Sequence, residues 1–271
     1  MVPRSGGASA VSANLPKGAR MTKRDYLGVF SLIFLFAGGI ALSESDRKFS
    51  IGAEVGVDWQ NRNDIRVPNA TGTQFSLPDV IGSGPYGLFR AEADFDINER
   101  HGFRFVFAPL EITDSGTLSY PVSFAGEAFD PNLPTEANYK FNSYRITYRY
   151  RFYDGPTWRW KIGATGFIRD ARIALSQNGK YAEDTDLGFV PLVYLQGMAR
   201  IGDDWRFVLD FDGLAASQGR AFDVAAKLAY ELSDAVEMGF GYRVIEGGAD
   251  VDQVYNFAWF NALVGSIRFS F

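Results

Sequence analysis

The chain has no cysteine, and it has only one histidine among its 271 residues. The absence of cysteine excludes disulfide frameworks and thiolate metal sites, and it is compatible with an oxidising compartment without requiring one. Long apolar runs are absent after residue 42, which excludes a helical membrane protein with several spans. No phosphate-binding loop and no zinc-binding spacing is present, so we expect no cofactor.

The bulk composition resembles that of a soluble protein, with a mean hydropathy of -0.10 and 22% charged residues. A transmembrane β-barrel has the same bulk properties, because only alternate residues of each strand face lipid. Composition therefore leaves both classes open, and the order of the residues must distinguish them.

One apolar run stands near the N-terminus, at residues 26–42. Lys23 and Arg24 precede it, and the small residues Ala41 and Ser43 follow it, an arrangement typical of a secretory signal peptide. An uncleaved helical anchor is the alternative. The predicted division is an upstream extension at 1–20, a signal peptide at 21–43 that starts with Met21, and a barrel domain at 44–271.

Removal of residues 1–43 would make the chain more acidic. These residues hold five of the 27 basic residues and one of the 32 acidic residues, so the remainder has nine more acidic than basic side chains. A nucleic-acid partner requires a basic surface, and this balance argues against one.

From residue 48 onward the chain divides into ten segments in which apolar and polar residues alternate. In the clearest of them Tyr144, Ile146 and Tyr148 alternate with Arg145 and Thr147, the pattern of a strand with two different faces. The ten expected strands are 49–60, 86–98, 103–107, 143–152, 158–168, 193–201, 205–212, 222–231, 238–243 and 259–271.

The connections between these segments alternate between long and short. The expected long loops are 61–85, 113–138, 176–186, 213–220 and 246–253, and tight turns separate them. Bacterial outer-membrane barrels have an even number of strands, short periplasmic turns and longer external loops. The pattern predicts an all-β fold, a ten-stranded antiparallel transmembrane β-barrel with an up-and-down meander, and it places both termini on the periplasmic side.

The last segment ends on an aromatic residue. Leu263, Gly265, Ile267, Phe269 and Phe271 fall on one face of this strand. The pattern resembles the closing strand of Gram-negative outer-membrane β-barrels, in which the terminal aromatic residue belongs to the insertion signal. The resemblance implies a location in the bacterial outer membrane, contact with outer-membrane lipid, and recognition of the last strand by the barrel-assembly machinery. A soluble β-sandwich or lipocalin-like barrel is the alternative, but it leaves the signal peptide and the terminal phenylalanine unexplained.

The polar faces of the expected strands carry charges of both signs. A ten-stranded barrel is only slightly wider than one that side chains fill, so we expect an ion-pair network across the lumen, in which arginines of segment 143–152 reach acidic residues of segment 86–98. The alternative is a selective channel, and we favour the side-chain-filled lumen. The network is expected to include Arg90, Glu92, Asp94, Arg104, Arg145, Arg149, Arg151, Lys161, Asp210 and Arg243.

Acidic residues also gather near the external ends of the strands, and carboxylates from several loops are suitable ligands for a divalent cation. Their spacing matches no known calcium loop, and solvated loops are the simpler explanation. The residues of this candidate cation site are Asp184, Asp186, Asp212, Asp223, Asp250 and Asp252.

The only histidine, His101, lies in an expected periplasmic turn beside Arg100. Outer-membrane lipid A deacylases and omptin-type proteases use a histidine near the outer face or rim, so neither chemistry fits, and we predict that the protein is not an enzyme. The expected function is a non-enzymatic envelope protein with ligand-facing external loops. A narrow passive solute pore is the first alternative, and a lipid-acting enzyme is the second.

Overall fold

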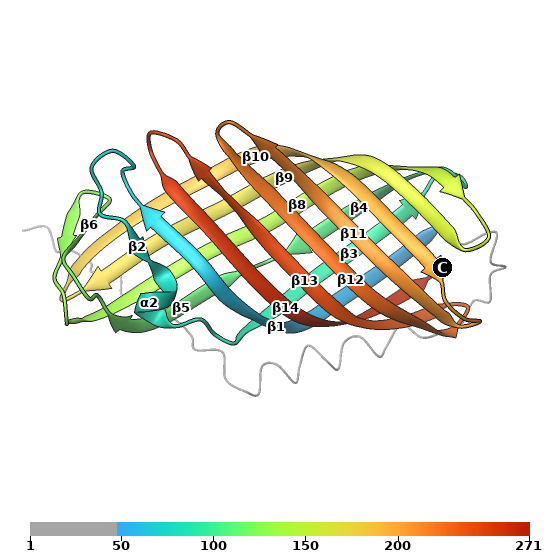
Figure 1. Cartoon of the computed structure of the whole chain (residues 1–271), viewed down its shortest axis with the longest axis horizontal. Coiled ribbons are helices and arrows are strands. Elements are labelled where there is room, and N and C mark those ends of the chain that lie inside the picture. The colour runs from blue at the N-terminus through green and yellow to red at the C-terminus, as the bar shows by residue number, and fades with distance from the viewer. Residues whose placement is uncertain (1–47) are drawn as a thin grey trace, which may run out of the picture. The chain divides into compact units, whose positions relative to one another are not determined.

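The structure is a computed structural model that describes residues 48–271, so the predicted upstream extension and signal peptide lie outside the described residues. These residues form a closed, antiparallel barrel of ten strands with meander connectivity (Figure 1), as the alternation predicts. The barrel strands are β1 (Phe49–Arg66), β3 (Tyr86–Asp96), β4 (His101–Ala108), β8 (Pro134–Asp154), β9 (Trp158–Gln177), β10 (Lys180–Arg200), β11 (Trp205–Ala216), β12 (Gly219–Ser233), β13 (Val236–Asp250) and β14 (Tyr255–Ser270). Within residues 48–271, no helix has the length and apolar character needed to cross a membrane.

The barrel closes where its first strand pairs with its last. β1 and β14 are in antiparallel register from Ser50 opposite Ser270 to Arg66 opposite Tyr255, with a bulge on β1 between Gln60 and Arg62. Beyond this ladder, the Phe271 N–H donates to the Phe49 carbonyl at 2.8 Å. Closure of this kind removes the free strand edges that lipid cannot satisfy.

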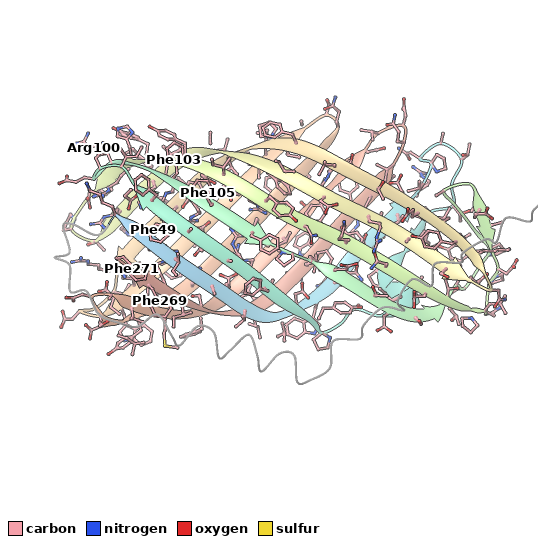
Figure 2. All side chains as sticks on the ribbon, turned by 180° about the vertical axis from the view of Figure 1, so that it is seen from behind. Phe49, Arg100, Phe103, Phe105, Phe269 and Phe271 are labelled. Atoms are coloured by element: carbon pink, nitrogen blue, oxygen red, sulfur yellow. The ribbon has the colours of Figure 1, made fainter. Side chains whose placement is uncertain are left out.

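Lys48 and Phe271 lie at the same end of the barrel, together with four short turns, and we call this end the terminal end. The opposite end, where the two long connections lie, is the loop end. Figure 2 shows Phe49, Phe269 and Phe271 gathered at the terminal end, where the rings of Phe49 and Phe271 stack with centroids 6.2 Å apart. Of the two residues of the expected insertion signal, Phe271 therefore lies beside the first residue of β1, and Phe269 lies opposite Ile51.

Three of the expected long loops are wrong, because the strands continue through most of them. β9 and β10 reach residues 177 and 180, β11 and β12 reach 216 and 219, and β13 ends at 250, so little is left of loops 176–186, 213–220 and 246–253. Asn178 and Gly179 turn β9 into β10 with φ values of 49° and 80°. Both residue types tolerate this left-handed conformation, which suits a two-residue hairpin.

The part of the barrel near the terminal end has apolar side chains on its outside, and we call it the belt. On β8 these are Tyr144, Ile146, Tyr148 and Phe152, each between 40% and 52% exposed. Their partners on the neighbouring strands are also apolar, with Tyr144 opposite Ile168 of β9, for example. An outside of this kind suits a hydrocarbon surrounding.

The part near the loop end reverses this polarity, and we call it the extension. On β8 the outward residues are now Glu136, Asn138 and Lys140, while Ala137 and Tyr139 are buried. Asn138 donates to Glu111 at 3.0 Å, across the pairing of β8 with β5 (Glu111–Thr117). Polar outward groups of this kind suit water.

The interior of the extension contains an apolar cluster, with the hydrogen-bonded pairs Gln60–Asn63 and Thr135–Gln177 buried beside it. The cluster combines inward residues of the long strands with three short elements from the long connections, β2 (Phe75–Ser76), α2 (Leu77–Ile81) and the hairpin of β6 (Val122–Phe124) and β7 (Glu127–Phe129). α2 packs directly on β5, because a Cβ added to Gly116 would lie 1.6 Å from the Val80 carbonyl oxygen. The buried members are Ile65, Val67, Phe75, Leu77, Val80, Ile81, Ile112, Leu118, Val122, Phe124, Phe129, Ala137, Tyr139, Ile173, Leu175, Ala182, Ala258 and Phe260.

Candidate functional site in the barrel lumen

Arg104 of β4 is the centre of one ion-pair network inside the belt, and only 1% of its surface is exposed. Its Nε donates to Asp94 Oδ1 at 3.1 Å, and its Nη1 donates to Asp210 Oδ2 at 2.7 Å. β8, β9 and β10 lie between β4 and β11 in the sheet, so the contact with Asp210 crosses the lumen. The guanidinium also lies 5.1 Å from the ring centroid of Tyr194, a favourable cation–π position.

Asp94 extends this network by accepting from two further arginines. Arg149 Nη1 lies 2.6 Å from Asp94 Oδ1, and Arg149 also contacts Asp96 at 2.9 Å. Arg268 of β14 contacts Asp94 and lies 2.7 Å from Glu92. We call this set the Arg104 network.

Asp223 of β12 is the centre of a second set, the Asp223 network, and is 3% exposed. It contacts Arg90 at 3.0 Å, Arg145 at 2.9 Å, and Arg243 on the neighbouring strand. Arg145 also lies 3.1 Å from Asp212. Because Arg90 and Arg145 come from β3 and β8, these contacts also cross the lumen.

Glu54 of β1 completes the Asp223 network. It accepts from Arg243 Nε at 2.6 Å and from Lys227 Nζ at 3.1 Å. A buried charge without a partner costs several kcal/mol, and here each carboxylate has a cation within 4.0 Å. The carboxylates of the two networks are Glu54, Glu92, Asp94, Asp96, Asp210, Asp212 and Asp223, and the cations are Arg90, Arg104, Arg145, Arg149, Lys227, Arg243 and Arg268.

Eight of the ten residues expected in the lumen network lie in these two sets, and Arg149 of β8 reaches Asp94 of β3 past the intervening strand. Arg151 instead donates to Asp154 at 2.6 Å near the terminal-end turn, and this hydrogen bond is the main cause of the lowered pKa of the Asp154 carboxyl. Lys161 makes no salt bridge with another side chain of residues 48–271.

The six aspartates of the candidate cation site do not come together. Asp212 and Asp223 face inward within the belt, where the arginines hold them. In the extension, Asp186 pairs with Arg169, and the pKa of Asp184 is raised by burial and by the charge of Asp186. The remaining two do not join them: Asp250 accepts from Asn69 at 2.7 Å, and Asp252 lies in the β13–β14 turn. In the described part of the chain, no group of three or more His, Asp or Glu side chains is placed to hold a metal ion.

Six members of the two networks are missing from the network that the sequence predicts, namely Glu54, Asp96, Asp212, Asp223, Lys227 and Arg268. Asp212 and Asp223 are expected in the candidate cation site instead. The alternation contains the signal for Glu54 and Arg268, because each lies on the polar face of its strand, next to an apolar residue of the other face. The sequence places Asp223 at the external rim because its strand is expected to begin at residue 222, three residues later than β12 begins.

His101 opens β4 at the terminal end. Its Nδ1 lies 2.6 Å from the Tyr148 hydroxyl, and its ring centroid is 5.1 Å from that of Tyr150. The histidine is therefore one of several rings on the outward face of β4 and β8, far along the barrel from the loop end.

The chain matches no protein-family model, and no curated protein matches its sequence. Solved structures do resemble it. Outer membrane protease OmpT from Escherichia coli is 10% identical over 86% of this chain and 99% of that one, with a TM-score of 0.51. Neisserial surface protein A is 13% identical over 82% and 97% of the two chains, with a TM-score of 0.36. Ail, the attachment invasion locus protein of Yersinia pestis, is 9% identical over 82% and 99%, with a TM-score of 0.38. At such identities the likeness concerns architecture alone: this chain has the fold of the small outer-membrane β-barrel proteins.

Proposed function

We propose that the protein lies in the outer membrane of a Gram-negative bacterium and acts there as a non-enzymatic envelope barrel whose lumen is closed to solutes. The belt supports the membrane location, because its outward Tyr, Ile, Phe and Val side chains match a lipid surrounding. The extension would then stand above the membrane, since its outward side chains are polar.

The main support for a closed lumen is the set of ion pairs that cross the lumen. Arg104 reaches Asp210, and Arg90 and Arg145 both reach Asp223, from strands that are not neighbours. These side chains are at most 9% exposed, which leaves little water between them. A solute would have to separate buried opposite charges, and leaving a buried charge unpaired costs about 3–5 kcal/mol.

A second barrier lies above the first. The apolar cluster of the extension lies between the networks and the loop end, with Phe124, Leu77 and Ile65 at 0% exposure. Ions that passed the networks would then meet an apolar region. Charged and apolar layers in series favour a structural or loop-mediated role over the alternative of a narrow passive pore.

The proposed orientation places the terminal end in the periplasm and the loop end outside the cell. The barrel-assembly machinery would then meet β14 and its residues Phe269 and Phe271 from the periplasmic side. A tag inserted near Gly179 should be reachable on intact cells, and one near Asp203 should not. Labelling of the tag near Asp203 from outside would contradict the orientation.

The absence of enzymatic activity is part of the proposal and is supported by the place of His101. Its Nδ1 is bonded to Tyr148 at the terminal end, and its ring lies among aromatic side chains. Mass analysis of lipid A from cells with and without the protein should show no difference. A modified lipid A species that depends on the protein would favour the lipid-acting enzyme instead.

Planar-bilayer recording tests the closed lumen. The wild-type protein should show very low and unsteady conductance, whereas Arg104→Ala combined with Asp210→Ala should raise it by removing a pair that crosses the lumen. The matched control is Arg169→Ala combined with Asp186→Ala, an ion pair in the extension, which should leave conductance low. A stable, large conductance of the wild-type protein would overturn the proposal in favour of the pore.

A further inference from the structure

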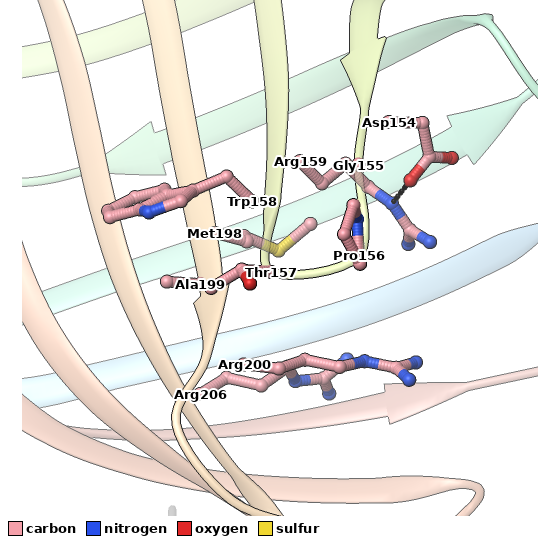
Figure 3. A pocket seen from close by; sticks show the side chains of 10 residues that line it. All are labelled: Asp154, Gly155, Pro156, Thr157, Trp158, Arg159, Met198, Ala199, Arg200 and Arg206. Carbon is pink, nitrogen blue, oxygen red and sulfur yellow. Dashed lines mark hydrogen bonds and ion pairs between the residues drawn. The ribbon is translucent and has the colours of Figure 1, made fainter.

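A pocket of about 190 Å³ lies at the terminal end, beside the turn that joins β8 to β9. The turn contributes Pro156 and Thr157, and the ends of β10 and β11 form the other wall (Figure 3). No residue that lines the pocket is a member of either ion-pair network, although Arg206 shares Glu237 with Arg268 of the Arg104 network.

Three arginines from three consecutive strands line this pocket, namely Arg159 of β9, Arg200 of β10 and Arg206 of β11. Arg200 is directly opposite Arg206 in the ladder between β10 and β11, so the two project from the same face of the sheet. In Figure 3 all three side chains extend to one side of the strands, and Trp158 extends to the other.

The charges of the three arginines are not equally balanced. Arg159 donates to Asp154 at 3.0 Å, and Asp154 also accepts from Arg151, so this carboxylate is already shared. Arg206 contacts Glu231 at 2.6 Å and also Glu237.

Arg200 has no carboxylate partner within residues 48–271, although it faces another arginine across the ladder. Like charges directly opposite each other destabilise a strand pair. Arg206 is already balanced by Glu231 and Glu237, so a bound anion would supply the opposite charge that Arg200 lacks.

We propose that this pocket binds a phosphate group, with the guanidinium groups of Arg200 and Arg206 as its principal donors. A guanidinium presents several N–H donors in a planar fork that matches the oxygens of phosphate. The Thr157 side chain lies in the same wall and adds a hydroxyl. The volume admits a phosphate together with part of the group that carries it.

Two sources supply such a phosphate, a phospholipid headgroup and a soluble periplasmic phosphate. The level of the pocket along the barrel fits the lipid source. Trp158, which also lines the pocket, extends to the opposite side of the strands from the three arginines and stacks on Trp160 with ring centroids 5.2 Å apart on the outward side of the belt, so the pocket lies at the level of these two rings. Aromatic girdles of this kind mark the level of lipid headgroups.

Calorimetric titration of the purified protein tests the site with two probes. Inorganic phosphate and short-chain phosphatidylglycerol are added separately to the protein in a neutral detergent, and a short-chain diacylglycerol, which lacks the phosphate, is the blank. We expect phosphate, phosphatidylglycerol or both to bind. Arg200→Gln should weaken that binding about tenfold or more, because a hydrogen bond to a charged group is lost. Arg200→Lys should retain part of it.

Arg100→Gln is the matched control, because Arg100 is an exposed arginine in another terminal-end turn, outside the pocket. This variant should bind like the wild type, and a heat-shift assay on gels should show that all variants fold. Binding of phosphatidylglycerol without free phosphate would identify a lipid headgroup as the ligand, and the reverse would identify a soluble phosphate. Absence of binding by either probe, or equal binding by Arg200→Gln and the wild type, would overturn the proposal.

Discussion

The two halves of β8 follow the same alternation with opposite sign. In the belt the outward residues include Tyr144 and Ile146, and the inward residues include Arg145 and Arg149. In the extension the outward residues are polar and the inward ones apolar, with Tyr139 only 3% exposed. The strand is continuous, so the backbone does not change, and the reversal must reflect what surrounds each half.

The difference shows that the two halves are held together by different interactions. Water surrounds the extension in the proposed orientation, and burial of its apolar cluster therefore gains the hydrophobic stabilisation of a soluble core. In the belt, an apolar side chain gains little by turning from lipid to the interior, because lipid tails are equally apolar. Ion pairs and hydrogen bonds across the lumen then provide the specific contacts of that half.

The largest expected effect comes from Asp223, which three arginines of the belt interior share. Asp223→Asn leaves Arg90, Arg145 and Arg243 short of negative charge, and we expect a loss of about 3–5 kcal/mol of unfolding free energy. Asp186→Asn removes a carboxylate from an ion pair in the extension, where Asp186 is 46% exposed, and should cost about 1 kcal/mol or less. Urea titration of the folded fraction in lipid vesicles measures both, and equal losses would contradict the comparison.

A charge on the outward face should distinguish the two surroundings. Tyr148→Arg places a cation in the belt, and a charge on the lipid face costs about 2–4 kcal/mol near the midplane. Glu136→Arg places a cation on the same face of the same strand, at an exposed position in the extension, and should be nearly neutral. If both variants fold equally well in lipid vesicles, the assignment of the belt is wrong.

The packing of α2 gives a smaller effect that is confined to the extension. Gly116→Ala would push a methyl group against the Val80 carbonyl, and overpacking of this kind costs about 1–3 kcal/mol. Gly87→Ala on β3 is the control, because no heavy atom lies within 4 Å of the added Cβ. Hydrogen exchange should show faster exchange in α2 and β5 of Gly116→Ala, with unchanged protection in β11 and β12. Faster exchange throughout the barrel would show that the two halves are not independent.

The smallest expected effect concerns Asp154 at the terminal end. Hydrogen bonds from Arg151 and Arg159 lower its pKa below the ordinary value of 3.8, so folding is favoured by its ionised form. This contribution is present at neutral pH and is lost as the pH falls through the lowered pKa. Asp154→Asn should therefore be less stable than the wild type by about 1 kcal/mol or less at pH 7, because the pair is exposed. The difference should disappear in acid, and a difference that grows below pH 4 would contradict the assignment.

The ten strands, their meander order and the common side of Lys48 and Phe271 follow from the sequence, because an alternation with apolar outward residues marks each belt segment. The same rule fails in the extension. Residues such as Asn138 and Tyr139 reverse the polarity, so the loop-end halves of β8, β9 and β10 read as loops. The presence of charges in the lumen is predictable for the same reason as the strands.

The partners of those charges are less predictable. Arg104 meets Asp210 because of the width and shear of the closed barrel, which bring distant strands within reach of each other. Alternation along one strand contains no information about that distance. Asp223 illustrates the limit, since its inward direction is visible in the sequence but its depth in the barrel is not.

Thiol labelling tests the closed lumen most directly. Because the chain has no native cysteine, only an introduced cysteine can react with the reagent. Ser143 and Thr147 face the interior of the belt and are 4% and 0% exposed, whereas Glu136 is exposed on the outside of the extension. Ser143→Cys and Thr147→Cys should resist a charged, water-soluble thiol reagent in the folded protein and react once it is unfolded, while Glu136→Cys should react in both states. Rapid labelling of both inward positions in the folded protein would show a water-filled lumen and contradict the account.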